Sequence, residues 1–111
     1  MFGGTLKGLV PAELLIILRG REGEFLFSEE GEPPLQIFVA GDRVTCARLG
    51  SDPLDERALV EELKKLYRAA EVAFFYRRGV YPKDCGLYIN APVDELVHRS
   101  AEDFRGPSPA S

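Results

Sequence analysis

The fold is decided by residues 24–48, EFLFSEEGEPPLQIFVAGDRVTCAR. Apolar and polar residues alternate over 24–28 and place Phe25 and Phe27 on one face, which predicts a half-buried strand. Residues 29–34 cannot continue this strand, because they are acidic, contain a glycine and end in two prolines. The first strand is therefore expected to end at a turn.

Two further strands are predicted in the same stretch, at 35–39 and at 44–48. Between them, Gly41 and Asp42 indicate a tight hairpin turn, because glycine accepts the positive φ angles that such a turn requires. Together with the strand at 24–28, they predict an antiparallel meander.

Helices are predicted on both sides of this meander. A short helix is expected over 11–19, with Pro11 in its first turn and Gly20 as its stop. The clearest helix should follow Asp52, whose carboxylate can cap it, with Pro53 in the first turn. Apolar residues at helical spacing carry this helix to about residue 69 or 70.

The remaining residues predict one or two strands and a closing helix. Residues 72–77 are rich in aromatic side chains and indicate a fourth strand, and 87–89 a brief fifth one. Asn90 is expected to cap the closing helix, with Pro92 in its first turn. The apolar face of that helix comprises Val93, Leu96, Val97, Ala101 and Phe104.

The expected fold class is α+β, because the strands run consecutively before the central helix instead of alternating with helices. The predicted order is a short N-terminal helix, an antiparallel meander of about four to five strands, one long central helix and a C-terminal helix. A length of 111 residues fits one domain. We expect it to span residues 1–105, with 106–111 as a Pro/Ser tail or the start of a linker.

Composition and charge make nucleic-acid binding and membrane insertion unfavourable interpretations of this sequence. The net charge is −4 and the sequence pI is near 5.0. Such a surface on average repels phosphates, so nucleic-acid binding is not favoured. No apolar run approaches the ~20 residues needed to cross a bilayer, and the N-terminus lacks the pattern of a secretory signal. These features predict a cytoplasmic protein with no membrane partner. The single Asn and single Gln beside many ion-pairing residues are typical of thermophile proteins.

No combination of residues in the sequence predicts a catalytic, cofactor or metal site. His98 is the only histidine and is expected to face solvent on the closing helix. Cys46 and Cys85 are expected to be free, mostly buried thiols, since a disulfide is unusual in a reducing cytoplasm. Cys85 can be drawn with His98 and with Asp84 or Asp94, but no spacing singles this arrangement out. Neither a metal-ligand pattern nor a phosphate-binding glycine loop occurs, so no catalytic residue, cofactor or metal is predicted.

The helix at 11–19 carries the one unusual pattern. Consecutive residues turn by ~100°, so the apolar run over 14–18 covers the whole circumference. One side must face the core, which leaves Ala12, Leu15 and Ile16 to contact another chain or to be covered by Val93 and Val97 of the closing helix. Both interpretations stay open. The candidate partner-binding residues are Ala12, Leu15, Ile16, Arg19, Tyr76 and Tyr81, since Tyr and Arg anchor interfaces well.

Seven segments, which cover nearly the whole chain, follow one another in a characteristic order. They are Phe2–Leu6, Leu9–Leu18, Arg21–Phe27, Ile37–Val44 with Ala47, Ala58-Leu59 with Leu63, Val72–Phe75 and Ile89–Asp103. This order of motifs resembles the bacterial PATAN-type domain, a family found in response-regulator and other signalling proteins. The chain departs from the family in a proline-rich 29–34 segment and a closing helix less rich in leucine. The resemblance implies an interaction module without known catalysis.

The expected function is therefore a non-enzymatic protein–protein interaction module of bacterial signalling or motility regulation. Its partner would be another protein or a second copy of itself. The alternative is a sensing domain that holds a small molecule between the sheet and a helix.

Overall fold

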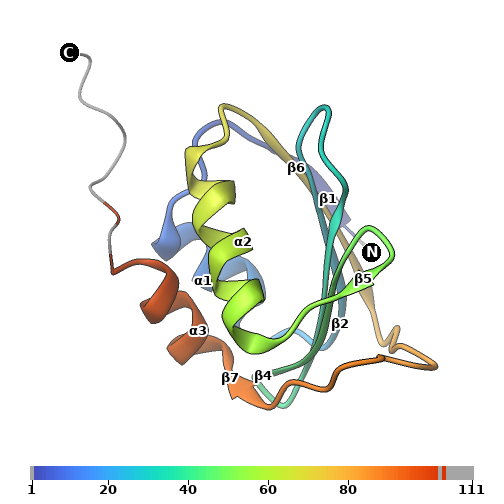
Figure 1. Ribbon diagram of the computed structural model, residues 1–111. Coiled ribbons are helices and arrows are strands. Elements are labelled where there is room, and N and C mark those ends of the chain that lie inside the picture. Colours follow the sequence, from blue (N-terminus) through green and yellow to red (C-terminus); the bar gives the residue numbers. More distant parts are fainter. Residues whose placement is uncertain (1, 103, 105–111) are drawn as a thin grey trace.

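A computed structural model describes residues 2–102 and 104 and places helices against one face of an antiparallel sheet (Figure 1). In these residues the helices are α1 (Pro11–Leu18), α2 (Glu56–Arg68) and α3 (Val93–Ser100). The strands are β1 (Phe2–Leu6), β2 (Gly23–Ser28), β3 (Leu35–Ala40), β4 (Arg43–Leu49), β5 (Asp52–Pro53), β6 (Val72–Arg78) and β7 (Ala91–Pro92). The predicted α+β class is confirmed.

The sheet has the order β1-β6-β2-β3-β4-β5, and β7 pairs with β4. The predicted meander is present as β2-β3-β4, with each pair antiparallel. After α2 the chain returns as β6, which inserts between β1 and β2. Strand β1 therefore forms one edge of the sheet, with β6 as its neighbour on one side only.

The predicted hairpin turn between β3 and β4 is confirmed. Gly41 has φ 60° and Asp42 has φ 57°, as a turn of the hairpin type requires at both central positions. Asp42 is the only non-glycine residue with positive φ in the described part of the chain. Its side chain accepts a hydrogen bond from the Gly20 amide, and its carbonyl oxygen accepts one from the Val93 amide.

The core lies between the sheet and the helices. Alternate residues of the central strands, including Phe25, Phe27 and Ile37, are fully buried on the face that the helices cover. Leu59 and Leu63 of α2 are buried in the same layer. The opposite face of the sheet is partly covered by residues 79–90, which are coloured orange at the lower right of Figure 1.

Several predicted boundaries are wrong for identifiable reasons. The central helix has 13 residues and begins at Glu56, because Asp55 caps it by accepting a hydrogen bond from the Ala58 amide at 2.8 Å. Asp52 and Pro53 instead form β5 beside β4. The described strands number seven, more than the four to five expected, since β1 and the two-residue strands β5 and β7 were not predicted.

The closing segment differs from the prediction as well. Residues 87–89 are not a strand, and the short strand lies at Ala91–Pro92. Asn90 does not cap α3; its side-chain oxygen accepts a hydrogen bond from Arg43 Nε at 2.9 Å. Helix α3 ends at Ser100, so Phe104 lies beyond it and packs edge-on against Tyr67.

The expectation of free thiols is wrong. Cys46 of β4 and Cys85 of the 79–90 segment form a disulfide, with their Cα atoms 5.8 Å apart. Both cysteines are fully buried and pack with Phe38 and Val80 on the sheet face away from the helices. The two residues are 39 positions apart in sequence, and only the path of 79–90 across this face brings them together.

No helix in the described ranges is long and apolar enough to cross a membrane. The predicted tail at 106–111 lies outside the described residues.

Candidate interaction surface

Apolar side chains lie around the whole circumference of helix α1, with Glu13 as its one charged residue, and only part of the helix is buried. Leu14, Ile17 and Leu18 enter the core, whereas Ala12 is exposed and Ile16 has 71% of its surface open to solvent. Leu15 is half-buried and packs against the core cluster. The exposed pair is four residues apart, so both side chains lie on the same face of the helix.

Helix α3 does not cover this exposed face. Val93 and Val97 are buried, and α3 contacts α1, as the alternative interpretation required. The Ile16 side chain nevertheless remains exposed to solvent. Of the two interpretations that the sequence left open, cover by α3 therefore does not apply to Ala12 and Ile16.

Arg21 joins the end of α1 to the start of β1. Its Nη1 donates to the carbonyl oxygens of Ile16 at 2.8 Å and Ile17 at 3.0 Å, which have no partner within the helix. A cation at this end also interacts favourably with the helix dipole. The same guanidinium lies 4.9 Å from the centre of the Phe2 ring. Phe2 is 39% exposed, so Arg21 contacts the backbone of the last turn of α1 and one exposed aromatic ring. We call Ala12 and Ile16 the Ile16 surface.

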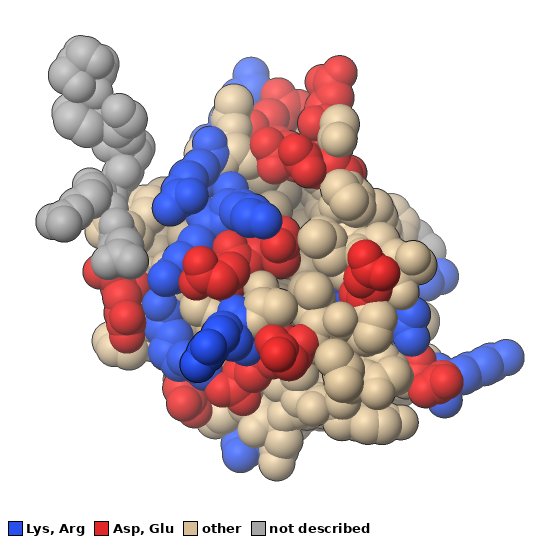
Figure 2. Space-filling view, in the orientation of Figure 1, with Lys and Arg blue, Asp and Glu red and all other residues tan. Residues whose placement is uncertain are grey.

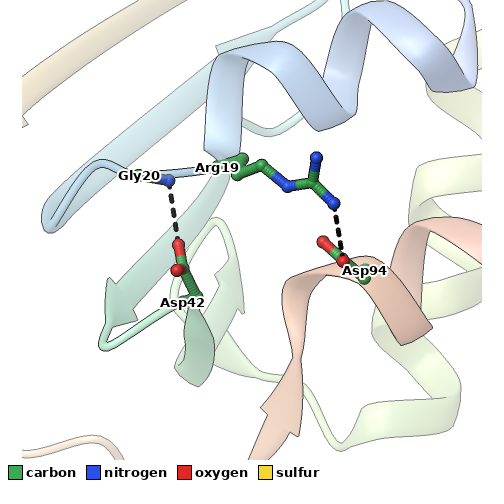
Figure 3. Close-up of polar contacts among 4 residues, drawn as sticks. All are labelled: Arg19, Gly20, Asp42 and Asp94. Atoms are coloured by element: carbon green, nitrogen blue, oxygen red, sulfur yellow. Dashed lines mark hydrogen bonds and ion pairs between the residues drawn. The ribbon is translucent and has the colours of Figure 1, made fainter.

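Two polar contacts fix α1 relative to its neighbours (Figure 3). Arg19 Nη2 donates to Asp94 Oδ2 of α3 at 2.7 Å, and the Gly20 amide donates to Asp42 Oδ1 in the β3–β4 turn at 2.8 Å. The Asp42 carbonyl in turn accepts from the Val93 amide at 2.9 Å. The hydrogen bond to Asp94, aided by that carboxylate's charge, raises the pKa of Arg19. The exposed face of α1 is thus held by contacts at its C-terminal end.

The predicted tyrosines have different environments. Tyr76 is 5% exposed, stacks on Phe25 with ring centres 4.7 Å apart and donates its hydroxyl to the Glu22 carbonyl at 2.6 Å. It is therefore a core residue and does not belong to the surface. Tyr81 is 47% exposed, and its hydroxyl donates to Glu22 Oε2 at 3.4 Å. Partial desolvation and the Glu22 charge raise the pKa of Tyr81.

The 79–90 segment exposes further apolar side chains. Leu87 is 46% exposed and Tyr88 is 79% exposed. The segment is fixed by the disulfide and by Arg48, whose Nη2 donates to the Asp84 carbonyl at 3.0 Å. These side chains lie on a loop that sequence analysis predicted to contain a strand.

A groove of about 420 Å³ lies between the sheet and the C-terminal half of α2. Phe27, Leu35 and Leu66 are among its apolar lining residues. In Figure 2 acidic side chains gather at the tip between β2 and β3, and basic side chains gather nearby over the end of α2. The charged lining residues are Glu29, Glu32, Glu62, Lys65 and Arg68.

Two arrangements considered from the sequence, a metal site and a Cys85–His98 pair, can be checked in the described residues. They contain no group of three or more His, Cys, Asp or Glu side chains placed to hold a metal ion. Cys85 is in the disulfide and has no thiol to act as a nucleophile, which removes the drawn pairing with His98. His98 is exposed on α3, as expected.

No protein-family model, curated protein or solved structure matches this chain. The resemblance to PATAN-type domains therefore stays a prediction that rests on the quoted motifs.

Phe2 and Arg21 were not among the predicted surface residues. Only the fold brings the Phe2 ring and the Arg21 guanidinium together at the end of α1. No local pattern in the first residues, MFGGT, indicates this contact.

Proposed function

We propose that this protein is a non-enzymatic protein–protein interaction module and that the Ile16 surface binds the partner. The observation that carries this proposal is the 71% exposure of Ile16 on a helix whose other side lies in the core. Isolated apolar residues on a surface are common, but Ile16 shares its exposed helix face with Ala12, and Arg21 contacts both the Ile16 carbonyl and the exposed Phe2 ring nearby.

The expected energy of this contact follows from burial. Removing an isoleucine side chain from water contributes about 1.5–3 kcal/mol. Replacing Ile16 by aspartate removes that contribution and leaves a carboxylate that must be desolvated in the complex. The loss of binding should therefore exceed tenfold, because about 1.4 kcal/mol corresponds to a factor of ten.

Affinity capture from a lysate of the natural host tests the proposal, with wild type compared with Ile16→Asp. We expect a partner that wild type retains and Ile16→Asp loses. Arg57→Asp is the matched control, since Arg57 is an exposed residue of α2 and the substitution also introduces aspartate. It should retain the partner.

Thermal unfolding of the three proteins shows whether the substitutions affect folding. Ile16→Asp should cost no more than about 1 kcal/mol, because an exposed side chain makes few contacts and a carboxylate near a helix C-terminus is only mildly unfavourable. Capture of the same partner by Ile16→Asp, or unfolding of that variant, would refute the proposal.

The biological setting we propose is bacterial signalling or motility regulation. Support for it is the resemblance of the motif order to PATAN-type domains, which occur beside receiver domains.

A second candidate function is supported by the groove between the sheet and α2. Its volume of about 420 Å³ lies in the range of small-molecule sites. The apolar floor is flanked by Glu29 and Glu32 on one side, and by Arg68 and the Lys65–Glu62 ion pair (3.0 Å) on the other. This lining suits a ligand with an apolar body and polar or charged ends. A thermal-shift screen that includes nucleotides and zwitterionic metabolites tests it: reproducible stabilisation at micromolar ligand supports sensing, and no shift with any compound contradicts it.

A further inference from the structure

A pocket of about 610 Å³ lies at one end of the sheet, between the residues that precede β2, the β3–β4 turn and the end of β6. Its lining includes two guanidinium groups, of Arg21 and Arg78, and two carboxylates, of Glu22 and Asp42. The pocket shares no residue with the Ile16 surface or with the groove beside α2. Its volume lies in the range of small-molecule sites, so it is a separate candidate for ligand binding.

Backbone amides fix the two carboxylates on the wall of this pocket. Glu22 Oε1 accepts a hydrogen bond from the Gly41 amide at 2.9 Å, and Asp42 Oδ1 accepts one from the Gly20 amide at 2.8 Å (Figure 3). Asp42 Oδ2 has no hydrogen-bond partner among the described residues, and Glu22 Oε2 has only the Tyr81 hydroxyl, at 3.4 Å. Both carboxylates therefore keep an oxygen that can accept from an ammonium group.

The two guanidinium groups keep unused donors as well. Arg21 is held by its Nη1, which donates to carbonyl oxygens of α1, and by the Phe2 ring beneath it, whereas its Nε and Nη2 donate to no described residue. The Arg78 side chain is exposed and makes no hydrogen bond or ion pair within the described residues. The planar fork of guanidinium donors matches the two oxygens of a carboxylate.

These four charged groups do not neutralise one another. In the part of the chain that the structure describes, no ion pair joins Arg21 or Arg78 to Glu22 or Asp42, although ion pairs elsewhere join Arg19 to Asp94 and Arg77 to Glu24. Three of the four pocket groups are nevertheless held by hydrogen bonds before any ligand arrives, which lowers the entropy cost of binding. The pocket is thus complementary to a small molecule that carries both a positive and a negative charge.

We propose that this pocket binds a free α-amino acid. The carboxylate of the ligand pairs with the guanidinium groups of Arg21 and Arg78, and its ammonium donates to the free oxygens of Asp42 and Glu22. Charges of both signs line one pocket, so the ligand must carry its two charged groups close together, as an α-amino acid does. This inference goes beyond the proposed function, because the pocket is separate from the Ile16 surface.

Thermal unfolding in the presence of each of the standard amino acids, at about 10 mM, tests the site, because a ligand that binds only the folded protein stabilises it. We expect at least one of them to raise the unfolding temperature. Titration calorimetry should then show that the affinity falls at least about tenfold when the same ligand lacks its amino group or its carboxyl group. An analogue with a single charge that binds as tightly as the amino acid would overturn the proposal.

Two variants locate the ligand. Arg78→Gln and Asp42→Asn each remove one charge from the pocket and should fold, because the Arg78 side chain has no partner in the described residues and an asparagine oxygen can still accept from the Gly20 amide. Each should lower the affinity for the amino acid at least about tenfold. Arg57→Gln is the matched control on the exposed side of α2 and should leave the affinity unchanged.

The outcomes distinguish this site from the others. No stabilisation by any amino acid would overturn the inference, while capture of a partner through Ile16 would still support the proposed function. An affinity that neither Arg78→Gln nor Asp42→Asn changes would overturn it too. If Arg68→Gln abolished that binding instead, the ligand would lie in the groove beside α2.

Discussion

Removal of the Cys46–Cys85 disulfide should lower stability by an amount that the loop length predicts. The perturbation is the double substitution Cys46→Ala with Cys85→Ala, or reduction of the wild type. The bond closes a loop with a sequence separation of 39 residues. The chain-entropy relation then gives about −13 cal/mol/K for the constraint on the unfolded chain, or about 4 kcal/mol at 25 °C. Against a typical total of about 5–15 kcal/mol, this is a large fraction.

Urea unfolding measures the effect. With an m-value of about 2 kcal/mol/M, the midpoint of the reduced protein should lie about 2 M below that of the oxidised protein. The double variant should resemble the reduced wild type, with a further loss from the cavity beside Phe38. Dithiothreitol should not change the double variant.

Mass spectrometry after alkylation without a reductant gives the decisive refutation. Two alkylated thiols in the natively purified protein would show that Cys46 and Cys85 are free. An unchanged urea midpoint on full reduction would refute the loop-closure reasoning instead.

Two other contacts give sharp expectations. Tyr67→Phe should cost about 1 kcal/mol, because it removes the 2.6 Å hydrogen bond between the Tyr67 hydroxyl and Ser100 Oγ, which chemical denaturation can measure. Burial raises the pKa of Tyr67, so the neutral phenol stabilises the fold at pH values below about 10 and this contribution is lost as pH rises through the higher folded-state pKa. Wild type should therefore lose stability above pH ~10 more steeply than Tyr67→Phe, and parallel pH profiles would contradict this. Asp42→Ala should cost about 2 kcal/mol in thermal unfolding, about half from the lost bond to the Gly20 amide and half from the left-handed backbone. Asp42→Asn keeps an acceptor and tolerates that backbone, so equal losses for the two variants would argue against this account.

The central part of the fold was predictable because local signals agree there. Alternation at Phe25 and Phe27 fixes the buried face of β2, and Gly41-Asp42 fixes the turn and thereby the register of β3 with β4. Helix α1 was also predictable, since the 100° step alone separates Ile16 from Leu14 and Leu18, but the sequence left open whether the closing helix covers the Ile16 side.

Strand β1 was not predictable from its own residues. Gly3 and Gly4 are poor strand formers, and the partner β6 begins more than sixty residues later. The structure explains one of the glycines: a Cβ at Gly3 would lie 2.6 Å from the Phe74 carbonyl oxygen, so only glycine permits this close pairing. Long-range pairing with β6 thus overrides the weak local strand preference of Gly3 and Gly4.

The burial of Tyr76 could have been inferred, whereas the disulfide could not. Residues 72, 74 and 76 share a face of β6, and a buried Val72 at the start of the strand predicts an inward Tyr76 and an outward Phe75. The pairing of Cys46 with Cys85 depends on how residues 79–90 cross the sheet, and no local pattern in that segment specifies this path.

Photo-cross-linking at position 16 in cells of the natural host tests the central claim most directly. Ile16 is replaced by a photo-reactive phenylalanine derivative, and Arg57 of α2 is replaced in the same way as the control. An interface at the Ile16 surface predicts a discrete covalent adduct with a protein from position 16 and none from position 57. No adduct from position 16, or adducts of equal yield from both positions, would contradict the claim that this surface binds a partner.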